Sequence, residues 1–233
     1  MLNDVGLRSQ LSPSQDQTNV IGGFKIGRSK AGKIPLDLQI QRLQVDESTL
    51  KELNERLVLV YSGTARLAKN LLQNVLQRWA RRSKEIVNNM RNLVHGAERA
   101  AVAISEKGDI EEVGRCMSEY RQQKKIMIGT DDAEPAHVTH LIEALSRENA
   151  ISGGVLLGAG GGGYLALVAA KGWKGMELKA IAEELCNGQD NGLSIESCTW
   201  HDCSVCEEGL RVMILEECTE NAGFLLEWQK PAS

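Results

Sequence analysis

The residues of this sequence best suited to chemistry form a glycine run between two apolar segments. Its glycines are Gly158, Gly160, Gly161, Gly162 and Gly163. Glycine loses more conformational freedom on folding than other residues, so such a run suits a backbone that needs positive φ angles or a close approach. Bare N–H groups in such a loop can also surround the oxygens of a phosphate. The run therefore predicts an anion-binding loop, with a flexible turn or linker as the alternative.

The surroundings of the glycine run separate it from two common phosphate-binding motifs. No Gly-Lys-Ser/Thr follows it, as a P-loop requires. A Rossmann fingerprint opens a helix, whereas this run leads into the apolar, strand-like segment 164–168. Another apolar segment, 155–157, precedes the run. Apolar flanks on both sides favour a loop within the fold over a linker.

A second group of candidate ligands lies near the C-terminal end of the sequence. Its members are Cys198, His201, Cys203 and Cys206. Cys-x2-Cys is a common zinc half-site, but a structural site usually takes its ligands from two separate half-sites, whereas these four lie within one short segment. We expect free thiols, with a zinc-stabilised binding domain as the alternative. His137 and His140, one helical turn apart, are interpreted as surface imidazoles rather than a metal pair.

The composition narrows the class of protein. The 233 residues include 27 Lys and Arg against 31 Asp and Glu, which gives a net charge of −4. This balance gives no electrostatic reason to expect DNA, RNA or an anionic membrane as a partner. No apolar run is long enough to span a bilayer, and the N-terminus lacks the basic-then-apolar pattern of a secretory signal. With six cysteines and no such signal, we expect reduced thiols and a cytoplasmic protein.

Apolar patterns predict strands on both sides of a helical block. The continuous apolar run 57–61 indicates a buried strand, and partial alternation over 34–45 indicates a half-buried one. Further strands are expected directly after the glycine run, over 193–200, over 210–215 and over 224–228. Asp46 or Ser48 is expected to cap a short helix before the run 57–61.

Apolar residues at three-and-four spacing predict amphipathic helices over 68–79, 86–104 and 110–127. Gly108 and Gly129 fall where helix ends are expected, and further helices are expected over 135–146 and 174–186. Strands, then helices, then strands indicate an α+β fold rather than a doubly wound parallel sheet. We assign residues 22–233 to this domain and residues 1–21 to a polar arm or a remnant of a catalytic loop.

Four segments, in order, give the sequence a resemblance to a known family. Residues 156–164, which contain the glycine run, look like the third signature motif of GHMP kinases. Residues 59–72 resemble the strand-to-helix segment of fucokinases and related heptose-phosphate kinases. Residues 24–31, and Tyr120 followed by Gln123-Lys124-Lys125, are also similar to fucokinases. The resemblance implies a GHMP kinase C-terminal domain, a helical block packed on a mostly antiparallel sheet.

The activity that this resemblance implies is phosphoryl transfer from ATP, with Mg2+, to a sugar. For fucokinases the acceptor is the anomeric hydroxyl of L-fucose. GHMP kinases hold the ATP phosphates with an early loop rich in glycine and serine, and we find neither this loop nor the N-terminal sheet in the sequence. We therefore expect a partial chain that a missing N-terminal half would complete. The alternative is a catalytically inactive interaction module, in which self-association or a partner covers exposed strands.

The resemblance implies that the glycine loop lies next to the sugar and the phosphates. It also implies candidate roles for two further residues. Fucokinases carry a Gly-Gly-x-Gln-Asp-Gln pattern at their catalytic aspartate, and residues 15–17 keep its last part, whereas Pro13 and Ser14 depart from it. Asp16 is thus the candidate base for the sugar hydroxyl, with an exposed loop carboxylate as the alternative. Arg66 opens the helix after a buried strand, where it could contact phosphate or sugar oxygens. We assign no metal ligand.

Overall fold

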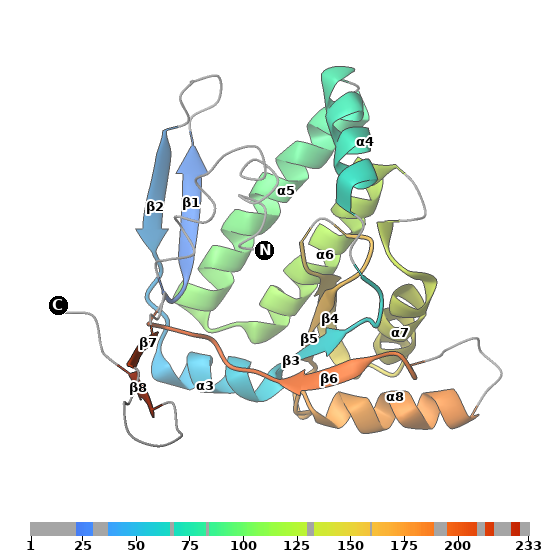
Figure 1. Cartoon of the computed structure of the whole chain (residues 1–233). Helices are drawn as coiled ribbons and strands as arrows, with labels where there is room; N and C mark the ends of the chain where they lie inside the picture. Colours follow the sequence, from blue (N-terminus) through green and yellow to red (C-terminus); the bar gives the residue numbers. More distant parts are fainter. Residues whose placement is uncertain are drawn as a thin grey trace.

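Four strands form an antiparallel sheet at the centre of the chain (Figure 1). In the order in which they lie side by side, they are β4 (Ile151–Leu156), β5 (Tyr164–Ala169), β3 (Leu57–Tyr61) and β6 (Thr199–Asp202). Every pairing between neighbours is antiparallel. The computed structural model describes residues 22–29, 37–65, 68–82, 84–129, 133–158, 160–188, 195–208, 213–216 and 225–228.

The helices around the sheet come mainly from the segment between β3 and β4. They are α4 (Ala68–Ala80), α5 (Lys84–Val102), the π-helical turn η1 (Ala103–Lys107), α6 (Ile110–Ile128) and α7 (Ala136–Arg147). α3 (Glu47–Arg56) precedes β3, and α8 (Glu177–Gly188) joins β5 to β6. Asp46 caps α3 by accepting a backbone hydrogen bond. Gly108 and Gly129 end η1 and α6 in the left-handed conformation, so the expected helix ends are confirmed.

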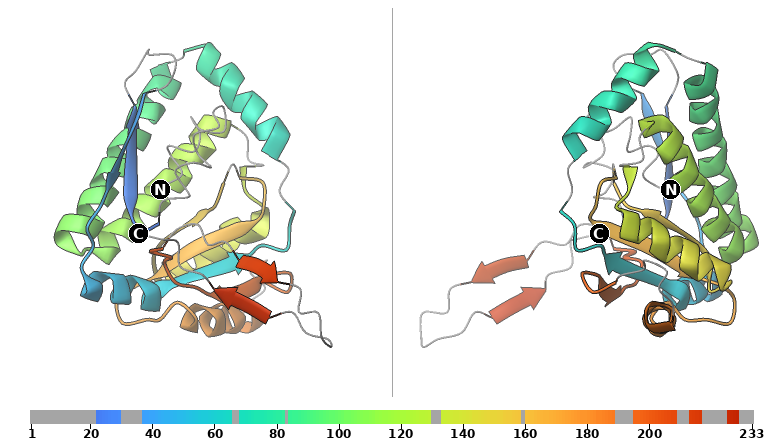
Figure 2. Two further views of the ribbon diagram at one scale, coloured as in Figure 1. Left: turned by 60° about the vertical axis from the view of Figure 1, so that its left-hand side comes forward. Right: turned by 90° about the vertical axis from the view of Figure 1, so that its right-hand side faces the viewer.

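Two hairpins lie outside the central sheet. β1 (Lys25–Ser29) pairs with β2 (Leu38–Arg42), and β7 (Met213–Glu216) pairs with β8 (Leu225–Trp228). The Arg28 guanidinium on β1 forms an ion pair of 2.6 Å with Glu98 of α5, which holds the first hairpin against that helix. Figure 2 shows the β7–β8 hairpin projecting away from the rest of the chain.

The connections of the central sheet follow the ferredoxin-like β-α-β-β-α-β arrangement. Counted along the chain from β3, its strands lie side by side in the order 2-3-1-4. α7 and α8 pack on one face of the sheet, and α6 packs on the other, with α5 beside α6. In Figure 1 α8 lies below the sheet and α5 and α6 lie above it. The predicted α+β class is confirmed, and the helical block is an elaboration of its first crossover.

The apolar side chains of the strands are buried by helices of the same chain. Val58, Val60 and Leu167 are each at most 1% exposed and pack with α7 and α8. On the opposite face, Val155 and Val168 belong to a second core that includes α5 and α6. Most of the described sheet therefore does not present the uncovered apolar faces that the alternative, an interaction module, would offer to a partner or a second copy.

Helix α6 approaches β4 so closely that their backbones touch. A Cβ atom added at Gly153 of β4 would lie 1.8 Å from the carbonyl oxygen of Gly114 in α6. A Cβ added at Gly114 would lie 2.5 Å from the Cβ of Ser152. Glycine is thus required on both sides of this contact, because any side chain would push the helix off the strand.

Some expected elements have different bounds in the structure. The strand expected over 34–45 spans only 38–42 within the described residues. The strand expected over 193–200 begins only at Thr199, because Cys198 N donates to Ile195 O and closes a turn before it. The polar arm 1–21 lies outside the described residues. Within the described part, no helix is both long enough and apolar enough to cross a membrane.

The contact between α6 and β4 predicts the effect of a single methyl group. Gly153→Ala should lower the free energy of unfolding by about 2 kcal/mol or more, which corresponds to a melting temperature roughly 4–8 °C lower for a chain of this size. The matched control is Gly96→Ala in α5, where an added Cβ meets no atom within 4 Å. This change should stabilise the helix slightly. Equal melting temperatures for the two variants in thermal denaturation would contradict the close contact.

Candidate functional site

The glycine run forms the turn between the paired strands β4 and β5, so the linker interpretation is wrong. Its described glycines all have positive φ, from +74° at Gly158 to +140° at Gly162. Side chains of L-amino acids rarely adopt such angles. A Cβ at Gly162 would also lie 2.6 Å from the carbonyl oxygen of Thr64. Backbone conformation and close approach together explain why this turn consists of glycine.

Hydrogen bonds hold the glycine loop between the end of β3 and the start of α7. Gly163 N donates to Thr64 O at 3.0 Å, and Ser62 N donates to Gly163 O at 2.9 Å. Gly161 N donates to Ala133 O, shortly before α7, at 2.9 Å. Three segments that are far apart in the sequence thus meet at this end of the sheet.

The described N–H groups of the glycine loop are of two kinds, those that bond to other described residues and those that do not. Those of Gly161 and Gly163 bond to the protein, whereas those of Gly158, Gly160 and Gly162 have no acceptor among the residues that the structure describes. A backbone N–H without an acceptor is costly unless water or a ligand supplies one. A loop with several such donors suits the oxygens of an anion, so the geometry is compatible with the predicted phosphate-binding role.

A buried lysine of α6 supports the start of the glycine loop. Lys124 is 6% exposed, and its ammonium group donates to the carbonyl oxygens of Leu156 and Gly158, each at 2.8 Å. The ammonium also lies 5.5 Å from the ring centre of Tyr120. Sequence comparison marked the segment 123–125 as similar to fucokinases but gave it no role. The structure shows that this lysine joins α6 to the end of β4.

An ion pair fixes the other contact of the glycine loop. Arg121 Nε lies 2.9 and 2.8 Å from the two carboxylate oxygens of Glu134. The two side chains are buried, with exposed fractions of 5% and 6%. Lys125 lies 3.2 Å from the same carboxylate, and Thr139 donates to it. Because Ala133 precedes Glu134, this buried pair positions the carbonyl that accepts from the glycine loop. Nothing in the sequence pattern indicated the pairing.

His137, at the start of α7, contacts the same end of the sheet. Its Nε2 lies 2.8 Å from Ser62 O. A carbonyl oxygen can only accept, so Nε2 carries a proton and donates. His137 is half-buried and engaged by the backbone, which differs from the surface imidazole that we expected, whereas His140 is exposed as expected. Among the described residues, no three Cys, His, Asp or Glu side chains are grouped so that they could hold a metal ion.

Two of the predicted site residues, Asp16 and Arg66, lie outside the described residues. Their candidate roles therefore stay predictions. The loop glycines are the part of the predicted site that the structure brings together, and it adds Lys124 behind them.

The cysteine cluster near the C-terminal end has ordinary packing contacts. Burial raises the pKa of the Cys198 and Cys203 thiols, which favours the protonated thiol in the metal-free chain. Cys203 Sγ lies 3.9 Å from Leu57 O, and the ring of His201 lies 5.7 Å from that of Tyr164. These contacts agree with the free-thiol hypothesis, which stays a prediction because they do not test zinc binding.

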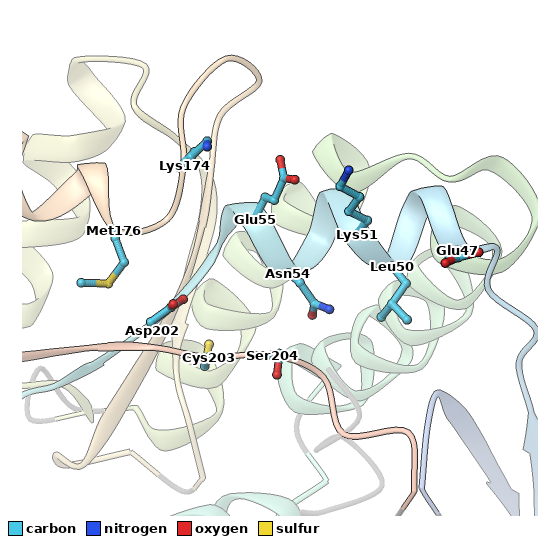
Figure 3. A pocket seen from close by; sticks show the side chains of 10 residues that line it. All are labelled: Glu47, Leu50, Lys51, Asn54, Glu55, Lys174, Met176, Asp202, Cys203 and Ser204. Carbon is cyan, nitrogen blue, oxygen red and sulfur yellow. The ribbon is translucent and has the colours of Figure 1, made fainter.

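A cleft of about 710 Å3 lies at the opposite end of β3 from the glycine loop. Figure 3 shows it between α3, the segment 174–176 and the segment 202–204. Charged groups of both signs line it, among them Lys51, Glu55 and Asp202. No glycine of the loop borders this cleft, and its mixed charges favour no single ligand. We therefore place the candidate site at the loop.

The chain matches known proteins in sequence as well as in fold. Residues 97–191 match the family model of the C-terminal domain of GHMP kinases. Over 174 residues the chain is 30% identical to the bifunctional fucokinase/GDP-fucose pyrophosphorylase of Arabidopsis thaliana. That alignment covers 73% of this chain but only 16% of the relative's length.

Solved structures show the same fold. Mevalonate kinase of L. major is 19% identical with a TM-score of 0.53, over 73% of this chain and 46% of that protein. D-glycero-D-manno-heptose 1-phosphate kinase of Bacteriodes thetaiotaomicron is 16% identical with a TM-score of 0.52, over 87% of this chain and 50% of that protein. The chain thus spans about half the length of these structures. It contains a GHMP kinase C-terminal domain and, as a distant homologue of a fucokinase, it belongs to the GHMP kinase family.

Proposed function

We propose that this chain is the C-terminal part of an ATP-dependent sugar kinase that phosphorylates the anomeric hydroxyl of L-fucose. The observation that carries the proposal is the 30% identity to a bifunctional fucokinase over 73% of the chain. The glycine loop supports it, because it offers backbone donors to an anion at the end of a sheet. Phosphoryl transfer depends largely on positioning and on stabilising phosphate charge, and donors of this kind contribute to both.

The residues of this chain fit one part of the ATP site and not the whole of it. The N–H groups of Gly158, Gly160 and Gly162 fit phosphate oxygens. Mg2+ is usually held by one or two carboxylates together with phosphates, and the described residues contain no grouped set of metal ligands. In this proposal, the metal ligands and the remaining phosphate contacts come from residues outside the described ranges. Asp16 is the proposed base and Arg66 a proposed contact to phosphate or sugar oxygens.

The direct test is phosphoryl transfer from Mg-ATP by the purified chain, with L-fucose as acceptor and other sugars as controls. Transfer specific to L-fucose would support the fucokinase activity and would show that this chain holds phosphate contacts beyond the glycine loop. Transfer to a different sugar would contradict fucose as the acceptor while keeping the kinase class. A chain that melts cooperatively but transfers no phosphate would contradict catalysis by this chain alone. That result would leave a partial chain and a catalytically inactive interaction module as the two explanations, and transfer by the complete kinase would decide between them.

The role proposed for the glycine loop predicts that one methyl group added to the loop weakens ATP binding. Gly162→Ala places a Cβ 2.6 Å from Thr64 O and must displace the loop, so we expect the dissociation constant for ATP to rise by roughly tenfold or more. Gly172→Ala is the matched control, since Gly172 also has positive φ but its added Cβ meets no atom within 4 Å. Titration calorimetry measures both. Equal affinity of the two variants would remove the loop from phosphate binding.

The role proposed for Asp16 predicts that its substitution lowers kcat without weakening sugar binding. In the complete kinase, Asp16→Asn should lower kcat by about 100-fold or more, because the amide cannot accept the sugar hydroxyl's proton, and should leave sugar affinity nearly unchanged. Asp202→Asn, an exposed carboxylate at the far end of the sheet, is the control and should retain activity. If Asp16→Asn also retains turnover, this residue is not the base.

A further inference from the structure

We propose that Tyr61, Tyr164 and His201 form a stacking platform for the ring of an uncharged sugar beside the glycine loop. This inference rests on the proposed sugar-kinase function and names the part of this chain that would contact the acceptor. Tyr164 directly follows Gly163 in the sequence. The platform is therefore continuous with the loop proposed to bind phosphate, as transfer to a sugar hydroxyl requires.

The three rings come from three neighbouring strands and gather on one face of the sheet. Tyr61 on β3 is the cross-strand partner of Tyr164 on β5, and such partners point to the same face. Their ring centres are 5.3 Å apart, with the planes tilted by 51°. The Tyr164 ring is also 5.7 Å from that of His201 on β6, although β3 lies between β5 and β6. The Tyr164 ring therefore leans across β3 toward β6.

Tyr164 is exposed where the rest of its strand is not. Its side chain is 45% exposed, whereas residues 165–169 of β5 are all buried. Tyr61 and His201 are half-buried beside it. A large ring held by two ring contacts, with nearly half of its surface open, has an ordered face on which another ring can pack.

The chemistry of the three side chains favours a sugar over a charged ligand. A pyranose presents C–H groups on its faces and hydroxyl groups around its edge. Aromatic rings suit the first, and tyrosine hydroxyl and imidazole nitrogen atoms suit the second. None of these three side chains is a carboxylate, a lysine or an arginine, so the platform offers no charged partner to an ionic ligand. A 6-deoxyhexose such as L-fucose adds a methyl group to the apolar surface that would contact Tyr164.

The experiment is saturation-transfer NMR on the purified chain, with L-fucose and a panel of other monosaccharides titrated in turn. Tyr164→Ala should weaken sugar binding roughly fivefold, within the range expected for loss of one ring contact. Tyr164→Phe, which keeps the ring, should bind within about twofold of the unchanged chain. Tyr164→Leu, which keeps apolar bulk without a ring, should resemble Tyr164→Ala. Because Tyr164 is exposed, all three should melt like the unchanged chain.

The matched control is Trp173→Ala, which removes an aromatic side chain of almost the same exposure, 44%, from the connection between β5 and α8. It should leave sugar binding unchanged. If Tyr164→Ala and Trp173→Ala bind L-fucose equally well, the platform is overturned, while fucose binding itself stands. If the unchanged chain binds a different sugar and not L-fucose, and Tyr164→Ala weakens the binding of that sugar, the platform stands and the proposed acceptor is wrong. If the unchanged chain binds no sugar, the platform is overturned, and the transfer assay still decides the kinase function separately.

Discussion

The backbone contact between α6 and β4 is the constraint on which the candidate site depends. With no side chain at Gly114 or Gly153, the helix lies directly on the strand. Lys124 is ten residues beyond Gly114 in α6, about 15 Å along a helix, and there its ammonium group reaches the carbonyls at the end of β4. A helix held one side chain farther from the strand would not bring this lysine to the glycine loop. Two glycines in the core thus set the position of the glycine loop.

The glycine loop combines two opposed requirements, since glycine increases conformational freedom and a binding loop needs a fixed shape. Positive φ along the loop can be adopted cheaply only by glycine. The freedom lost on folding is offset by fixed partners on three sides, namely Thr64, Ala133 and the Lys124 ammonium. A loop fixed before a ligand arrives has less entropy to lose on binding. Order is therefore imposed by the surroundings and not by the residues of the loop.

Local patterns in the sequence predicted much of the fold, because helix periodicity and buried strands are local properties. The run 57–61 is β3 as expected, and the glycine run connects two strands. What could not be predicted depends on distant residues. Arg121 and Glu134 form a buried pair only because α6 and the start of α7 meet at one end of the sheet. The approach of Tyr61, Tyr164 and His201 depends on strand order, which no periodicity gives.

The charges at this end of the sheet agree with the role proposed for the glycine loop. The described loop region offers backbone N–H donors, and Lys124 places a positive charge directly behind them. The carboxylate of Glu134, which follows the loop's acceptor Ala133, is paired with Arg121 and Lys125. These donors and the lysine suit the stabilisation of negative charge, as the proposed phosphate-binding role requires. In the proposed kinase the base is Asp16, so the test of that residue decides whether this chain contributes to proton removal as well as to phosphate binding.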